Sequence, residues 1–143
     1  MRHIKKIIDD NKLHENVRFT GRLSPAEMAQ RMKRSHAFVM PSCVETHSSS
    51  LREAMSVGVP SVSTCVGSVP EFMHHGNNGF LYRYGEVQTL AHYIDKIFSN
   101  DNMSENIGKN AKQTIEEMFP QGKIGELILS AYRQIMDGGK GNE

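Results

Sequence analysis

The chain has 143 residues, the size of one domain that can fold around its own hydrophobic core. Its 17 basic and 16 acidic residues leave a net charge of +1, which argues against a nucleic-acid-binding protein. No run is long and apolar enough to span a membrane, and the start at Met1 runs into Asp9 and Asp10, unlike a signal peptide. Cys43 and Cys65 lie in or beside apolar runs, where buried, reduced thiols are usual, so we expect a cytoplasmic protein.

The N-terminal part of the chain predicts helices and strands in alternation. Residues 1–13 place apolar side chains at near-helical spacing, the pattern of an amphipathic helix. Residues 17–20 read as a short strand that ends at a glycine. A serine, a proline and a glutamate then stand at the positions of an N-cap, a first helical residue and a capping box, which predicts a helix over 25–34. The apolar run 37–40 is typical of a strand buried on both faces.

The alternation continues along the rest of the chain. In order, we expect a helix over 50–57, a strand over 61–64, a short helix over 70–75, a strand over 80–82, and helices over 90–98, 103–118 and 124–135. Pro120 separates the last two helices, and a disordered tail over 138–143 follows a single domain over 1–137. Strands that alternate with helices through short loops indicate an α/β fold with a doubly wound parallel sheet.

The stretch from Pro41 to Pro60 carries the chemistry, because it joins a buried strand to a helix through a loop that holds carboxylates. Glu45 lies in that loop and Glu53 in the first turn of the helix. The start of a helix presents unpaired backbone N–H groups and a positive dipole end, which suit an anion. Three hydroxyl groups lie at the same place, those of Ser48, Ser49 and Ser50. A phosphate flanked by hydroxyl groups, as in a nucleotide sugar, fits these donors and acceptors.

Several motifs in order resemble the donor-binding, C-terminal domain of family 4 glycosyltransferases, which have the GT-B fold. The resemblance extends from about Val17 to Tyr132 and rests on Pro-Ser at 41–42, Glu45, Glu-Ala-Met at 53–55, Gly-Val-Pro at 58–60, Gly67, Pro-Glu at 70–71 and Gly-Asn-Asn-Gly-Phe at 76–80. One departure is that Thr46, His47 and Ser48 stand where the family usually has Gly-Phe-Gly. We interpret the serines as substitute donors for a phosphate.

The resemblance implies a role for each candidate residue. Glu53 would accept hydrogen bonds from the ribose hydroxyls, although it also fits a capping box with the backbone of Ser50. Glu45 would be the catalytic carboxylate, near the donor sugar, where it steadies positive charge at the anomeric carbon. His47 would contact the sugar or a phosphate. The backbone of three residues would meet the nucleobase, with the second as an alternative phosphate ligand: Gly21, Arg22 and Leu23.

The resemblance also implies a partial enzyme. The chain would begin in the helix before the third strand of a Rossmann-like domain, as the partial C-terminal half of a GT-B glycosyltransferase followed by C-terminal helices. We expect it to bind a UDP- or GDP-sugar for retaining transfer to a glycan or lipid-linked acceptor, without a metal or other cofactor, and to be inactive without an acceptor-binding N-terminal domain or subunit. The full enzyme would serve polysaccharide biosynthesis, with peripheral membrane association possible.

Three alternatives remain open from the sequence. The chain fits the donor-binding subunit of a split enzyme, whose partner would be a separate acceptor-binding chain. A sugar-nucleotide epimerase of the same fold and a non-enzymatic flavodoxin-like binding domain are less favoured, the second because it gives the paired glutamates and the serine-rich helix start no purpose. For the partial domain that the resemblance implies, we expect uncovered apolar surface and an open sheet edge, which invites pairing with another chain.

Overall fold

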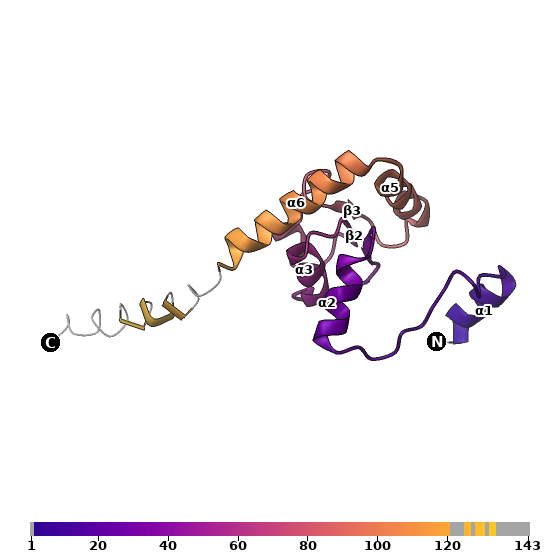
Figure 1. Ribbon diagram of the computed structural model, residues 1–143, viewed down its shortest axis with the longest axis horizontal. Coiled ribbons are helices and arrows are strands. Elements are labelled where there is room, and N and C mark those ends of the chain that lie inside the picture. The colour runs from indigo at the N-terminus through magenta and orange to yellow at the C-terminus, as the bar shows by residue number, and fades with distance from the viewer. Residues whose placement is uncertain (1, 121–124, 127, 131, 134–143) are drawn as a thin grey trace.

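The computed structural model describes residues 2–120, 125–126, 128–130 and 132–133 (Figure 1). Its helices are α1 (Arg2–Asp10), α2 (Pro25–Lys33), α3 (Ser49–Ser56), α4 (Val69–Phe72), α5 (Val87–Ser99) and α6 (Asp101–Met118). Its strands are β1 (Phe38–Met40), β2 (Ser61–Thr64) and β3 (Phe80–Tyr82). Among these residues, no helix has the length and apolar character needed to cross a bilayer.

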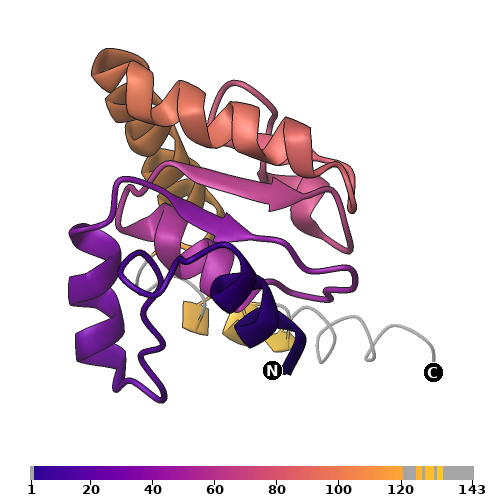
Figure 2. The same ribbon diagram turned by 90° about the vertical axis from the view of Figure 1, so that its right-hand side faces the viewer.

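The strands form one parallel sheet in the order β1-β2-β3. Val39 of β1 is paired with Val62 of β2, which in turn is paired with Phe80 of β3. Every residue of the central strand β2 is buried, whereas β1 is buried at only one of its positions. The sheet is layered between α5 on one side and α3 on the other (Figure 2). The carboxyl ends of the strands therefore lie along one rim, where doubly wound folds bind their ligands.

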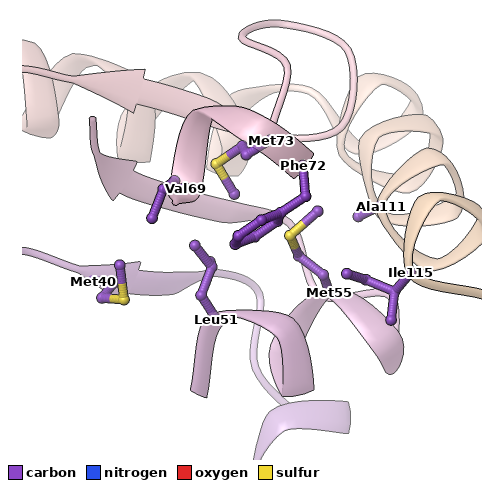
Figure 3. Packing of buried hydrophobic residues seen from close by; sticks show 8 residues of the cluster. All are labelled: Met40, Leu51, Met55, Val69, Phe72, Met73, Ala111 and Ile115. Carbon is purple, nitrogen blue, oxygen red and sulfur yellow. The ribbon is translucent and has the colours of Figure 1, made fainter. Parts of the chain in front are cut away.

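A hydrophobic cluster joins α3, α4 and α6 to the same face of the sheet (Figure 3). Phe72 points between Leu51 and Met55 in this cluster, and each of these side chains is at most 1% exposed. The other members are Met40, Val69, Met73, Ala111 and Ile115. Burying one such large side chain is worth about 1.5–3 kcal/mol, so this cluster fixes the position of α3 and of the loop in front of it.

The opposite face of the sheet is covered by α5. Its cluster contains Val62, Phe80 and Tyr82 from the strands, together with Ile97 and Ile107 from the helices. A third, smaller cluster of Met32, Ala54 and Val59 packs α2 against α3. These contacts hold α2 beside the second half of α3, which matters for the site described below.

Most of the predicted elements are confirmed. The strands predicted over 37–40, 61–64 and 80–82 are present, with the first beginning one residue later, and the helices predicted over 1–13, 25–34, 90–98 and 103–118 correspond to α1, α2, α5 and α6. The helix predicted over 70–75 is shorter, and the one over 50–57 begins and ends one residue earlier. The boundary at 137 and the tail 138–143 lie outside the described residues. Of the helix predicted over 124–135, residues 125–126, 128–130 and 132–133 are described and are helical.

Two expectations were wrong. Residues 17–20 form no strand, and the side chains of Val17 and Phe19 are 40% and 57% exposed. The reason is that a strand needs a neighbour for its backbone groups, and no other described strand lies beside this segment. Cys43 and Cys65 are free but exposed rather than buried, because each lies beyond the end of its strand, in the loops at the rim.

Candidate functional site

The start of α3 is the centre of the site. Ser48 is its N-cap residue, with a left-handed backbone at φ 47° and ψ 50°. Its side chain makes no capping hydrogen bond, and its Oγ is buried without a hydrogen-bond partner in the described structure. A left-handed conformation costs a residue other than glycine about 1–2 kcal/mol. A strained backbone and an unpaired buried hydroxyl thus coincide at Ser48, at the N-terminus of α3. Such features are common at ligand-binding sites.

The predicted capping box at Ser50 and Glu53 is wrong. Because the helix begins at Ser49, the capping-box partner position falls on Leu51, and Glu53 lies more than a full turn inside the helix. The Glu53 side chain is exposed, and its carboxylate accepts no hydrogen bond from the described residues. Ser49 and Ser50 are exposed in the first turn, where the first helical N–H groups have no partner within the helix.

The loop that holds Glu45 is fixed by the end of β2. The Ser42 hydroxyl donates to Glu45 Oε1 at 3.0 Å and thereby orients the carboxylate. Thr64 Oγ1 donates to the Ser42 carbonyl at 2.6 Å, and Ser68 Oγ donates to the Thr46 carbonyl at 2.7 Å. These bonds tie the loop after β1 to the loop after β2, so the half-buried Glu45 has a defined place at the rim.

Gly67 is the residue that allows the two loops to meet. It has a φ of 55°, and a Cβ built there would lie 1.9 Å from the carbonyl oxygen of Glu45. Any other residue would push the Glu45 loop away, because real side chains do not approach backbone this closely. Gly67 therefore sets the position of Glu45 through backbone contact alone.

A cavity of about 400 Å³ lies between the start of α2 and α3. Leu23 and Glu53 both line it, although they are far apart in the sequence. The remaining lining residues are Ser24, Pro25, Met28, Ala29, Met32, Ser56 and Val57. The walls are thus mainly apolar, which suits a flat aromatic ring of a ligand. The carboxylate of Glu53 is available to polar groups of the same ligand.

Among the residues that line this cavity, Glu53 is the one with an ionisable side chain, and its carboxylate accepts no hydrogen bond from the described residues. The neighbouring carboxylate of Glu27, by contrast, is already bonded. The Ser24 hydroxyl donates to Glu27 Oε2 at 2.7 Å, and the Ser24 backbone N–H donates to the same oxygen at 2.8 Å. Hydrogen bonds from Ser24 lower the pKa of Glu27, so this capping box is fully formed at neutral pH. The Ser56 hydroxyl donates to the Glu53 carbonyl at 2.7 Å. A ligand in the cavity would therefore meet the Glu53 carboxylate as its free acceptor.

The structure brings most of the predicted site residues to this rim. Glu45, His47 and the serines 48–50 lie on one continuous loop and helix start, with His47 exposed. Gly21 and Arg22 are exposed as well but line no part of the cavity that contains Glu53. Gly21 has a φ of 65° and turns the chain ahead of Leu23.

Sequence reasoning missed the residues that hold the Glu45 loop. Thr64 and Ser68 act through hydroxyl groups that belong to another strand end, and nothing local in the sequence connects them to Glu45. Gly67 was recognised as part of the motif series, but its close approach to the Glu45 carbonyl required the structure. As for metals, the described residues contain no group of three or more His, Cys, Asp or Glu side chains able to hold an ion.

Comparison with known proteins gives a consistent result. The family model described as "Glycosyl transferases group 1" matches residues 2–114. N-acetyl-alpha-D-glucosaminyl L-malate synthase of Bacillus anthracis is 26% identical over 133 residues, a match that covers 93% of this chain and 34% of that protein. HepE of Anabaena, solved in complex with UDP, has a TM-score of 0.86 and 27% identity, covering 93% of this chain and 36% of that chain. The chain thus spans about a third of these relatives.

One solved structure is itself a C-terminal domain. It comes from the group 1 glycosyl transferase LpcC of Francisella tularensis and has a TM-score of 0.76 at 19% identity, so the likeness concerns the fold alone. The match covers 82% of this chain but only 61% of that domain. Part of the Francisella domain therefore has no counterpart here.

Proposed function

Because the chain belongs to the group 1 glycosyl transferases, we propose that it is the nucleotide-sugar-binding part of a retaining glycosyltransferase. Its parallel sheet between helices is a partial C-terminal, Rossmann-like half of a GT-B fold. The observation that carries the proposal is the pairing of a cavity lined by Leu23 and Glu53 with the anion-suited start of α3. A nucleoside that occupies the cavity beside Glu53 would direct its phosphates along α3 towards that helix start.

The donor would bind in three parts. The base enters the apolar cavity beside Leu23, and the ribose hydroxyls donate to the Glu53 carboxylate. The diphosphate meets the free N–H groups at the start of α3 and the hydroxyls of Ser48, Ser49 and Ser50. The buried, unpartnered Ser48 Oγ supports this placement, since a phosphate oxygen would satisfy it.

The sugar would then lie against the loop of Glu45 and His47. Ser42 holds one carboxylate oxygen of Glu45, which leaves the other to face the sugar and to stabilise positive charge that develops at the anomeric carbon. His47 is exposed beside it and is available to a sugar hydroxyl or a phosphate. In this role Glu45 is the catalytic residue, and Gly67 and Ser68 position it.

UDP is the nucleotide that the comparisons favour. The Anabaena protein HepE has been solved with UDP and with UDP-glucose, at 27% and 26% identity to this chain. A GDP-sugar remains the second donor to test, because the walls that would face the base are mainly apolar and the one ionisable lining group, Glu53, is assigned to the ribose.

The acceptor lies beyond the part of the enzyme that this chain provides. We infer that a hydroxyl of a glycan or lipid-linked acceptor receives the sugar, and that an acceptor-binding domain or subunit is needed for transfer. A cytoplasmic enzyme of polysaccharide biosynthesis, associated peripherally with a membrane, fits this acceptor class. The chain alone should bind the donor nucleotide but transfer no sugar.

Thermal unfolding with UDP, GDP and ADP tests the proposal directly. A ligand at a hundred times its Kd that binds only the folded state adds about 2.7 kcal/mol of stability. One nucleotide should raise the melting midpoint, and Glu53→Ala should abolish the rise. Glu105→Ala is the matched control, because its carboxylate is exposed on α6, away from the cavity. The proposal is wrong if no nucleotide raises the midpoint, or if Glu53→Ala and Glu105→Ala respond alike.

A further inference from the structure

The loops that follow β1 and β2 run side by side in a fixed register. Thr64 Oγ1 donates to the Ser42 carbonyl, and the two residues are 22 apart in the sequence. Ser68 Oγ donates to the Thr46 carbonyl, and these residues are also 22 apart. Because the same separation recurs at both ends of the contact, the two loops keep their alignment along this part of the rim.

Two thiols occupy one step of this register. Cys43 and Cys65 are separated by the same 22 residues as the hydrogen-bonded pairs, and they come directly after the first of those pairs. Further along, Glu45 and Gly67 have this separation too, and their backbones approach each other closely. The register therefore places Cys43 opposite Cys65, with contacts between the loops before and after them.

The spacing of the two loops suits a disulfide. Hydrogen bonds hold them as neighbouring strands are held, and such strands are about 4.8 Å apart. A disulfide joins Cα atoms that are about 4.4–6.8 Å apart. The Cys65 N–H donates to the Tyr82 carbonyl at 3.0 Å, which fixes the backbone at one end of such a bond.

Both thiols are accessible to a reagent in solution. Cys43 and Cys65 are free, and each is exposed. They are the two cysteines of the chain, so no third thiol competes with them. Structural cysteines are usually buried, whereas redox-sensing cysteines are exposed and stand next to a second cysteine that resolves the first oxidation product. The position of this pair matches the second kind.

We propose that Cys43 and Cys65 form a reversible disulfide that fixes the Glu45 loop to the loop after β2. The co-reactant is a low-molecular-weight disulfide of the glutathione class. One cysteine thiolate attacks a sulfur of this disulfide and expels one thiolate, and the second cysteine then attacks the mixed disulfide and expels the other. The two cysteines lose two electrons and two protons, and the small disulfide leaves as two thiols. A thiol reductant reverses the reaction.

The bond acts on the part of the rim that carries Glu45. Glu45 follows Cys43 by two residues, and in the reduced chain hydrogen bonds hold its loop to the loop after β2. A covalent link between the loops restricts the unfolded chain and should raise the melting midpoint. It should also suppress the local opening that separates the two loops.

Oxidised glutathione tests the pair on the whole chain. The reduced protein is brought to exchange equilibrium with it, and the intact mass is measured. We expect a monomer that has lost two hydrogen atoms, with a higher melting midpoint and slower hydrogen exchange at the amides of residues 43–47, all reversed by dithiothreitol. Unchanged mass, glutathione retained on both cysteines, a disulfide-linked dimer, or a disulfide without these two effects overturns the proposal.

A shifted cysteine tests the register itself. Cys65→Ser combined with Val66→Cys moves the second thiol one residue along the same loop. This shift should slow disulfide formation by about tenfold or more, because one step in a strand-like register turns a side chain to the opposite face. Cys43→Ser is the matched control, which should retain one glutathione and gain no stability on oxidation. Equal rates for the natural and the shifted pair, or a rise of the midpoint in Cys43→Ser, would overturn the assignment.

Discussion

Replacing Ser48 with glycine is expected to stabilise the fold and to weaken nucleotide binding. The left-handed backbone of Ser48 costs about 1–2 kcal/mol in any residue with a Cβ, and glycine removes this cost. A buried hydroxyl without a partner costs about 1–3 kcal/mol more, by the evidence of mutated proteins. Against these gains, glycine adds about 0.4–1 kcal/mol of backbone entropy to the unfolded chain.

The net gain for Ser48→Gly is therefore about 1–4.5 kcal/mol, and the assay is urea unfolding with the midpoint and slope measured separately. Ser48→Ala removes the hydroxyl and keeps the Cβ, so the difference between the two variants isolates the backbone contribution. Ser49→Gly is the position control: Ser49 lies inside the helix, where glycine should cost up to about 1 kcal/mol. The argument fails if Ser48→Gly is no more stable than the parent chain.

The predicted loss of nucleotide affinity follows from the same Ser48 hydroxyl. A hydrogen bond to a charged group is worth about 1.5–3 kcal/mol, so loss of the Ser48 hydroxyl should raise the Kd for UDP by about tenfold or more. Calorimetry on Ser48→Gly and Ser48→Ala measures this loss, which should be similar in the two variants. Unchanged affinity in both would show that the hydroxyl faces no phosphate, while leaving the stability prediction intact.

Three further substitutions test the framework of the site. Asn78→Ala should cost about 3 kcal/mol in urea unfolding, because the buried amide bonds the Phe72 carbonyl, the Thr114 hydroxyl and the His74 N–H. Gly108→Ala should destabilise by about 1–3 kcal/mol despite its better helix propensity, since its Cβ would lie 2.2 Å from the Gly58 carbonyl oxygen; a more stable variant would contradict the close crossing of α3 and α6. Gly67→Ala should displace Glu45, which faces the sugar in the proposed site. Calorimetry should therefore show a larger loss of affinity for UDP-glucose than for UDP.

The sequence predicted those parts of the fold that depend on local pattern. The runs that became β1 and β3 are recognisable because they consist entirely of apolar and aromatic residues, although only Met40 of β1 and two residues of β3 are fully buried. The start of α3 was misplaced by one residue because the left-handed backbone of Ser48 has no sequence signature in a serine. Residues 17–20 have the pattern of a strand, but a strand depends on backbone partners that come from elsewhere.

For the candidate site, too, the sequence predicted the residues that are close together along the chain but not the contacts between separate elements. Glu45, Glu53 and the serines between them lie on one loop and helix start, so their proximity follows from the sequence alone. The cavity that joins Leu23 to Glu53 depends on the packing of α2 against α3, through Met32 and Ala54, and required the structure. The same is true of Ser68, whose hydroxyl reaches the Glu45 loop from the next strand end.

The donor cavity and the Glu45 loop are held by different parts of the fold, which makes their roles separable by experiment. The cavity is built by α2 and α3, whereas the Glu45 loop is held by hydrogen bonds from the end of β2 and from Ser68. A change in the cavity should therefore affect every ligand that carries the nucleoside, and a change in the loop should affect only ligands that carry the sugar. Loss of both UDP and UDP-glucose binding in Glu53→Ala, with a selective loss of UDP-glucose binding in Gly67→Ala, is the pattern that this division predicts.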